Sequence, residues 1–293
     1  MTAHVLAPFY QALGHRVWPR LGALWIDVGR FTLITAPADA VVTVCREDVQ
    51  QLLRETGRLA AVFPLAHDVG IECLNHCVRD KNYSLRSLQS KFRANVVRNH
   101  RHFEVRQIAW SELRDCGLSV YRLTRERHGV ASPPSVSEER WSEICAAGEK
   151  TPGLEVTACF QGQVLTGFLI SWTQRETCYS LSLFGDRSYS ELRAANVLVH
   201  NYTSQMISRT GIESVSMGRD WWPPVASRSR FKRHAGYAEE RLFLGVILHP
   251  RWSGILESTL TRNALRVLDR LTGGRIAFLR NVQLLDSAAA TRM

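Results

Sequence analysis

Residues 211–237 gather the side chains of this sequence that are best suited to chemistry on an anionic or polar group. They read GIESVSMGRDWWPPVASRSRFKRHAGY: a short apolar run, a turn with charged and aromatic residues, and a basic stretch that ends at a glycine. Lys232 is one of only four lysines in a chain whose Lys and Arg total 37. A compact ammonium kept where arginine is otherwise used indicates an anion contact, although chance gives the same pattern.

Asp220 is a candidate for proton transfer in this segment. Burial beside Trp221 and Trp222 would raise the pKa of its carboxyl, which helps a carboxylate accept a proton near neutral pH. The alternative is an ordinary turn residue paired with Arg219. The two tryptophans are expected either to form an apolar wall for a substrate or to plug the core.

The overall charge indicates anionic ligands. The formal net charge is +10 and the pI is about 9.6, so the surface attracts nucleic acid, phospholipid head groups or cofactor phosphates. Genomic base composition also produces arginine-rich proteins, so charge alone does not choose among these. The most basic stretch is 79–106, where Leu85, Leu88, Phe92 and Val96 have helical spacing. It predicts an amphipathic helix whose basic face is either solvated or meets an anion.

Other classes of protein are disfavoured by the sequence. Seven cysteines in apolar contexts are typical of reduced thiols in a cytoplasmic protein. Cys73, His76 and Cys77 lack a second ligand pair at zinc spacing, so no metal is expected. Neither a secretion signal nor a membrane span is predicted. Residues 5–25 are expected to form an amphipathic helix that docks on the domain or lies on a membrane surface.

The elements that must position these residues follow a regular order. Strands are predicted at 23–28, 31–35 and 59–65, with a helix capped by Asp39 that ends near Thr56. From residue 103 onward we predict, in order, strand 103–108, helices 111–127 and 137–147, strands 154–160, 164–173 and 177–184, helix 190–209, strand 212–217, helix 228–234 and strand 241–249. The domains expected are a partial α/β subdomain at 1–80, a main domain at 81–250, a C-terminal amphipathic helix at 251–285 and a disordered tail at 286–293.

This order, with its local motifs, resembles the GNAT-like acyl-CoA N-acyltransferases, in particular the FemAB-related and acetyltransferase-like proteins. The resemblance covers about residues 80–250 and is carried by Asn196-Val-Leu, Gly211-Ile, Ser216-Met-Gly218-Arg219 and Phe231-Lys232-Arg233-His-Ala-Gly236. It implies an α+β fold in three α/β layers. The central sheet would be mixed and mostly antiparallel, with a splayed parallel strand pair and helices on both faces.

The resemblance implies an N-acyltransferase that moves an acyl group from acyl-CoA, acetyl-CoA first, to an amine such as an amino sugar or amino acid. The donor phosphates would bind at the N-terminus of the helix that follows the third hairpin strand. The donor-binding residues are then Arg187, Ser188, Arg193, Ala194, Asn196 and Lys232. The glycine turn that GNAT enzymes carry at this point is absent, and Glu191 stands there, so an aminoacyl-tRNA donor, as in the Fem enzymes, stays open.

The same resemblance assigns the remaining roles. Asp220, His200 and Tyr237 are the candidates for removing the proton of the amine, and Arg219, Trp221, Trp222 and Arg233 are the candidates for binding the acceptor. The alternatives are a catalytically inactive GNAT-like scaffold and a basic nucleic-acid-binding protein. A small-molecule amine is the expected partner, tRNA enters only as a donor, peripheral membrane contact is left open, and so is the oligomeric state.

Overall fold

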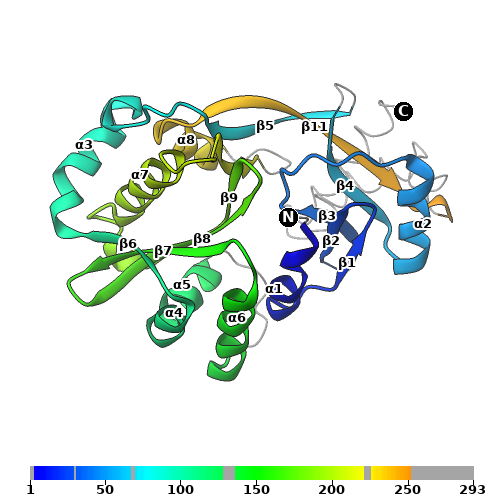
Figure 1. Ribbon diagram of the computed structural model, residues 1–293, viewed down its shortest axis with the longest axis horizontal. Coiled ribbons are helices and arrows are strands. Elements are labelled where there is room, and N and C mark those ends of the chain that lie inside the picture. The colour runs from blue at the N-terminus through cyan, green and yellow to red at the C-terminus, as the bar shows by residue number, and fades with distance from the viewer. Residues whose placement is uncertain (1–2, 30, 67–69, 128–135, 221–225, 252–293) are drawn as a thin grey trace, which may run out of the picture. The chain divides into compact units, whose positions relative to one another are not determined.

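The computed structural model describes residues 3–29, 31–66, 70–127, 136–220 and 226–251 (Figure 1). Two compact units divide these residues. Unit 1 consists of residues 76–218 and 230–239, and unit 2 consists of residues 2–75, 219–229 and the chain from 240 onward. The predicted C-terminal helix, the tail, Trp221 and Trp222 lie outside the described residues.

Unit 1 is built on a mixed sheet. Its strand order is β5-β10-β9-β8-β7-β6. The strands β6 to β9 pair antiparallel with their neighbours, and β9 pairs parallel with β10. The strands are β5 (Ile71–Val78), β6 (Glu104–Ile108), β7 (Leu154–Gln161), β8 (Val164–Gln174), β9 (Thr177–Gly185) and β10 (Ser214–Arg219). The predicted mostly antiparallel sheet with one parallel pair is confirmed.

Helices cover both faces of this sheet, as predicted (Figure 1). One face carries α7, with α3 beside it, and the other carries α4, α5 and α6. These helices are α3 (Ser90–Asn99), α4 (Trp110–Cys116), α5 (Leu118–Arg127), α6 (Glu138–Lys150) and α7 (Ala194–Ile207), followed along the chain by α8 (Ala226–His234). The side chain of Ser137 accepts the N–H of Arg140 at the start of α6, so Ser137 is the N-cap of this helix.

The core of unit 1 lies between α7 and the sheet. Leu198 and Tyr202 of α7 are at most 1% exposed and pack in one cluster with Leu169 of β8 and Val215 of β10. Tyr237 belongs to the same cluster although it follows α8. Residues 230–239 therefore complete a core that residues 76–218 begin.

Unit 2 has the strand order β1-β2-β3-β4-β11-β5. Strands β3 and β4 run parallel, so the chain must cross over between them, and α2 makes this crossover. The elements are α1 (Ala7–Ala12), β1 (Val17–Arg20), β2 (Ala23–Val28), β3 (Thr32–Ala36), α2 (Arg46–Thr56), β4 (Ala60–Leu65) and β11 (Ala238–Leu248). In its core, the rings of Trp25 and Phe63 meet edge to face with centroids 5.4 Å apart.

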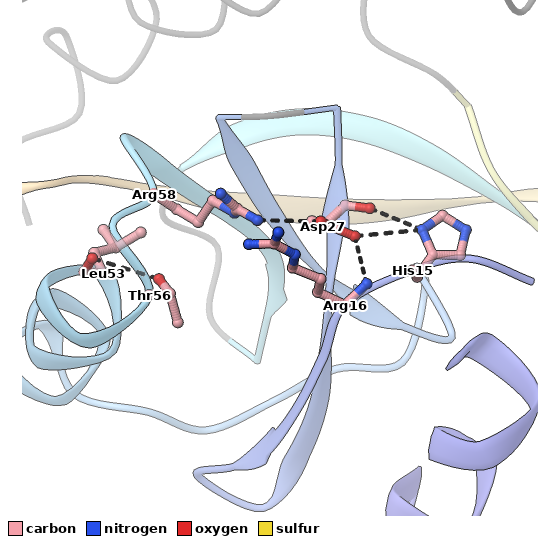
Figure 2. Close-up of polar contacts among 6 residues, drawn as sticks. All are labelled: His15, Arg16, Asp27, Leu53, Thr56 and Arg58. Atoms are coloured by element: carbon pink, nitrogen blue, oxygen red, sulfur yellow. Dashed lines mark hydrogen bonds and ion pairs between the residues drawn. The ribbon is translucent and has the colours of Figure 1, made fainter. Parts of the chain in front are cut away.

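A polar cluster around Asp27 ties β2 to two neighbouring loops of unit 2 (Figure 2). The Asp27 carboxylate accepts the backbone N–H of Arg16 at 2.9 Å and the guanidinium of Arg58 at 3.1 Å. Nδ1 of His15 lies 2.9 Å from the Asp27 carbonyl oxygen, and Arg58 stacks 5.5 Å above the Trp18 ring. The Asp27 and Arg58 side chains are only 17% and 12% exposed, so this pair is largely withdrawn from water and holds the loops firmly.

Several predicted element boundaries were wrong. The helix expected at 5–25 ends at Ala12, and Val17 begins a strand instead. The helix assigned to an Asp39 cap begins at Arg46, where the Cys45 sulfur accepts the N–H of Asp48. The helix expected at 111–127 is two helices that meet at Gly117. Strand β5 was not predicted at all.

Candidate functional site

The candidate site lies in unit 1, where β9 and β10 stop pairing. Their parallel register covers three residue pairs, from Ser214 opposite Thr177 to Ser216 opposite Tyr179. On its other side, β9 remains paired with β8 as far as Gly185. Among the described residues, the two strands are therefore not paired with each other beyond Tyr179 in β9 and Ser216 in β10. This is the splayed parallel pair that the sequence predicted.

A β-bulge marks the same stretch of β9. Ser182 lies opposite Ile170 and Ser180 lies opposite Ser171, so Leu181 is an extra residue in β9. A bulge leaves its extra residue outside the regular ladder and re-aims the backbone, and it is common next to active sites. Residues 179–183 are also only partly buried although β9 is an interior strand. A ligand can therefore reach the backbone of β9 here.

The N-terminus of α7 follows β9 after a short connection that contains a 3-10 turn. Its N-cap residue, Arg193, has φ of 56°, and no side chain caps the helix. The first N–H groups of an α-helix have no partner within the helix. Here they belong to Ala194, which is buried, and Ala195, which is half-buried. Arg187 and Ser188 lie on the preceding 3-10 turn and are exposed, and the Ser188 N–H already donates to the Asp186 carboxylate at 2.8 Å.

Lys232 lies on α8, and its side chain contacts the end of β10. Its ammonium donates to the carbonyl oxygen of Gly218 at 2.8 Å, and the side chain is half-buried. The predicted anion contact is therefore at least partly a contact with the backbone. Arg233 is exposed and its guanidinium pairs with Glu239 at 3.4 Å.

Two of the predicted bases, His200 and Tyr237, also belong to unit 1. His200 is half-buried on α7, with its ring 5.6 Å from that of Tyr83. Burial lowers the pKa of its imidazole, which is therefore neutral at pH 7. Its Nδ1 is buried and has no hydrogen-bond partner among the described residues.

Tyr237 has a different environment. It is 3% exposed, and its hydroxyl lies 2.5 Å from Oγ1 of Thr203. Because Thr203 donates to the carbonyl of Val199, the Tyr237 hydroxyl is the donor in this pair. Burial also raises its pKa well above the ordinary value, so the hydroxyl stays protonated, and this placement favours a packing role.

Arg219 and Asp220 belong to unit 2. The Asp220 carboxylate is buried and accepts the Ser229 hydroxyl at 2.7 Å, while its N–H donates to the Leu74 carbonyl at 2.7 Å. The Arg219 Nε donates to the Ala38 carbonyl at 3.0 Å, and burial lowers the pKa of its guanidinium. The described structure thus places the predicted site residues in two groups, one in each unit.

The sequence did not predict the bulge at Leu181. It also did not predict the polar contacts that Cys178 and Ser180 make with Tyr202. The Ser180 hydroxyl donates to the hydroxyl of Tyr202 at 3.2 Å, and the Cys178 sulfur lies 3.2 Å from the same oxygen. The available signal was the Ser-Leu-Ser-Leu alternation at 180–183, which is unusual in an interior strand.

Two further tests apply only to the described residues. They contain no group of three or more His, Cys, Asp or Glu side chains placed to hold a metal ion. None of their helices combines the length and the apolar character that crossing a bilayer requires.

Comparisons with known proteins give a consistent picture of the fold. No protein-family model and no curated protein match the sequence. Among solved structures, the C-terminal domain of a putative lysylphosphatidylglycerol synthetase from Agrobacterium fabrum aligns with a TM-score of 0.54 and 14% identity over 83% of this chain and 87% of that one. FemX aligns with a TM-score of 0.54 and 9% identity over 88% and 94%. L-PGS from Bacillus licheniformis aligns with a TM-score of 0.52 and 13% identity over 85% and 88%. The chain therefore has the fold that this synthetase domain, FemX and L-PGS share.

Proposed function

We propose that this protein is an acyltransferase that moves an acyl group from an activated donor to an amine, with the donor bound in unit 1. The observation that carries the proposal is the end of β9–β10 pairing at Tyr179, directly followed by the bulge at Leu181 and by the uncapped N-terminus of α7. The fold shared with FemX and with structures named as lysylphosphatidylglycerol synthetases, whose product by name carries a lysyl group, supports the same reaction class.

Acyl transfer needs a binding site for the donor, stabilisation of the oxyanion and a base for the amine proton. The end of β9–β10 pairing and the N-terminus of α7 support the first two. The donor's phosphates bind the free N–H groups of Ala194 and Ala195, and Arg193 adds a positive charge. The acyl carbonyl then lies along β9 at Leu181, where backbone N–H groups without a β10 partner stabilise the oxyanion of the tetrahedral intermediate. Because these N–H groups are fixed by the β8 ladder, little reorganisation is needed during the reaction.

The third requirement is a base for the amine proton. In unit 1, His200 fits this role better than Tyr237. The imidazole is neutral at pH 7 and accepts a proton, whereas the Tyr237 hydroxyl is protonated and already donates to Thr203. Asp220 stays a candidate from unit 2, with its carboxylate held by Ser229.

Acyl-CoA and aminoacyl-tRNA are the two donors to test, because each contains both phosphate and a transferable acyl group. Acyl-CoA is our first choice. The missing glycine turn keeps the aminoacyl-tRNA alternative open, whereas Glu191, exposed just before α7, opposes the phosphates of either donor.

The proposal predicts that a carboxylate at the start of α7 repels the donor. In Ala195→Asp, a negative charge within about 5 Å of a phosphate costs on the order of 3 kcal/mol at an effective dielectric constant near 20, so donor affinity falls at least tenfold. The same carboxylate stabilises the helix, so the Tm stays equal or rises. Ala195→Asn is the matched neutral control and keeps donor affinity. Calorimetric titration measures the affinity of each variant for acetyl-CoA, and filter binding measures its affinity for aminoacyl-tRNA.

Turnover is measured with label in the acyl group and glucosamine or an amino acid as acceptor. Donor binding without transfer to any acceptor would support the inactive scaffold instead. Equal donor affinities in Ala195→Asp and Ala195→Asn would show that the donor does not bind at the N-terminus of α7.

A further inference from the structure

The outward surface of α3 in unit 1 is strongly basic and has few partners. Leu85, Lys91, Arg93, Ala94, Val97 and Arg98 are all exposed, and we call them the α3 face. No Asp or Glu occurs in α3. Among the described residues, none of the three cations of this face forms an ion pair, and the ion pairs of the surrounding basic stretch use Lys81 and Arg106 instead. This positive surface is therefore not neutralised by the protein itself.

The α3 face has an ordered arrangement of apolar and charged positions. Phe92, Val96 and Asn99 are buried and define the inner side of the helix. Helical spacing then places Ala94 and Val97 along the middle of the outer side. Lys91 and Arg98 form one border of this row and Arg93 forms the other. Val97 is 50% exposed and Leu85, just before the helix, is 37% exposed.

We propose that the α3 face docks unit 1 onto the surface of an anionic lipid bilayer. The proposal is independent of the acyl-transfer reaction. The charge is complementary to anionic head groups, and the cations can extend from the two borders to the phosphates while Ala94, Val97 and Leu85 enter the boundary between head groups and acyl chains. Arg86 and Arg101, in the 3-10 turns before and after α3, are exposed too and add positive charge to this region.

A bilayer fits this face better than a nucleic acid. An RNA or DNA surface would leave the central apolar row in contact with water or phosphate, without gain. Nucleic-acid surfaces commonly add exposed aromatic rings on which bases stack, yet the one aromatic residue of α3, Phe92, is 3% exposed and packs inward. The row of Ala94 and Val97 therefore points to a lipid partner.

The test is sedimentation of the full-length protein with vesicles of phosphatidylcholine containing 30% phosphatidylglycerol, compared with phosphatidylcholine alone. We expect binding only to the anionic vesicles and its loss in 0.5 M NaCl. Arg93→Gln with Arg98→Gln should weaken binding about 25-fold, since each cation near an anionic surface contributes roughly fivefold. Arg114→Gln with Lys150→Gln removes the same charge from other exposed sites of unit 1 and should change binding little.

Val97→Ser separates the lipid from other anions because it keeps every charge. It should weaken vesicle binding roughly three- to fivefold and leave binding of a fluorescent RNA hairpin unchanged. Equal losses in the two double variants, equal binding to both kinds of vesicle, or RNA binding that depends on Arg93 and Arg98 without any vesicle binding would each overturn the proposal. Unchanged circular dichroism of all variants shows that their folds are intact.

Discussion

At the scale of single residues, His200 makes stability depend on pH. Burial lowers the pKa of its imidazole below the ordinary value of 6.5, whereas the unfolded chain titrates near that value. As pH falls below 6.5 the unfolded state binds a proton before the folded state does, so the free energy of unfolding decreases until the folded pKa is passed. In His200→Gln this contribution is absent. Urea denaturation from pH 8 to pH 5 should show a smaller loss of stability in the variant than in the parent protein.

The parent protein and the variant differ only at residue 200, so the difference between the two curves reports on His200. Parallel curves would mean that His200 is hydrated well enough to titrate normally. If His200 is also the base of the reaction, the rate of the parent protein falls at low pH as the imidazole becomes protonated. His200→Gln then loses activity at every pH.

Lys232 is held by the backbone of β10, and this predicts a structural cost for its removal. Lys232→Met keeps the aliphatic stem but loses the ammonium that donates to the Gly218 carbonyl. A hydrogen bond from a charged donor is worth about 1.5–3 kcal/mol, and partial solvation lowers this, so we expect a loss of about 1–2 kcal/mol in chemical denaturation. Lys232→Arg is the control for charge. A stability unchanged in Lys232→Met, with weaker donor binding, would show that the ammonium serves the anion alone.

The sequence located some of these residues but not their partners. Arg193, Ala194 and Lys232 were identified from motif and composition. The structure places the first two at the N-terminus of α7 and the third on α8, with its ammonium on β10. The partner of Lys232, a backbone carbonyl, carries no side-chain signal. The Ser-Leu-Ser-Leu alternation at 180–183 marks β9 as an unusual interior strand, but it does not locate the bulge at Leu181, because the bulge depends on the register between β8 and β9.

At the scale of elements, the contact between α4 and α6 depends on a glycine. A Cβ at Gly148 would lie 2.6 Å from ring atoms of Trp110. Gly148→Ala gains up to about 1 kcal/mol in helix propensity but overpacks this contact, which typically costs 1–3 kcal/mol. We expect a net loss of about 1 kcal/mol in thermal or urea unfolding. In the background Trp110→Leu the same change should cost less or stabilise, because the crowded ring is gone.

Sequence patterns identified elements best where hydrophobic periodicity was strong. Strands β7, β8 and β9 and helix α6 were predicted within a few residues. Strand β5 was missed because its polar residues Asn75 and His76 interrupt the pattern, although His76 is fully buried. The cap of α2 was missed because a cysteine sulfur takes the place of the usual oxygen.

At the scale of the whole molecule, the chain does not complete one unit before starting the next. Unit 1 takes residues 230–239 in addition to 76–218, and unit 2 takes residues 219–229 and the chain from 240 onward. Hydrophobic patterning shows which segments are buried but not which core they join, since both units bury apolar strands. The predicted domains at 1–80 and 81–250 were contiguous for this reason.

The discontinuous assembly of unit 1 predicts how fragments behave. A fragment of residues 71–239 contains β5 whole and every part of unit 1, so we expect it to unfold cooperatively. A fragment of residues 71–218 lacks Ala235 and Tyr237, which are 0% and 3% exposed in the unit 1 core, and loses the carbonyl that accepts the Tyr83 hydroxyl at 2.8 Å. Removing a buried aromatic side chain alone costs about 3–5 kcal/mol, a large part of the 5–15 kcal/mol that stabilises a domain. The shorter fragment should therefore show no cooperative transition in circular dichroism. In the longer fragment, Tyr237→Phe keeps the ring and tests the contribution of the hydroxyl alone. If the two fragments are equally stable, unit 1 is complete at residue 218 and the prediction is wrong.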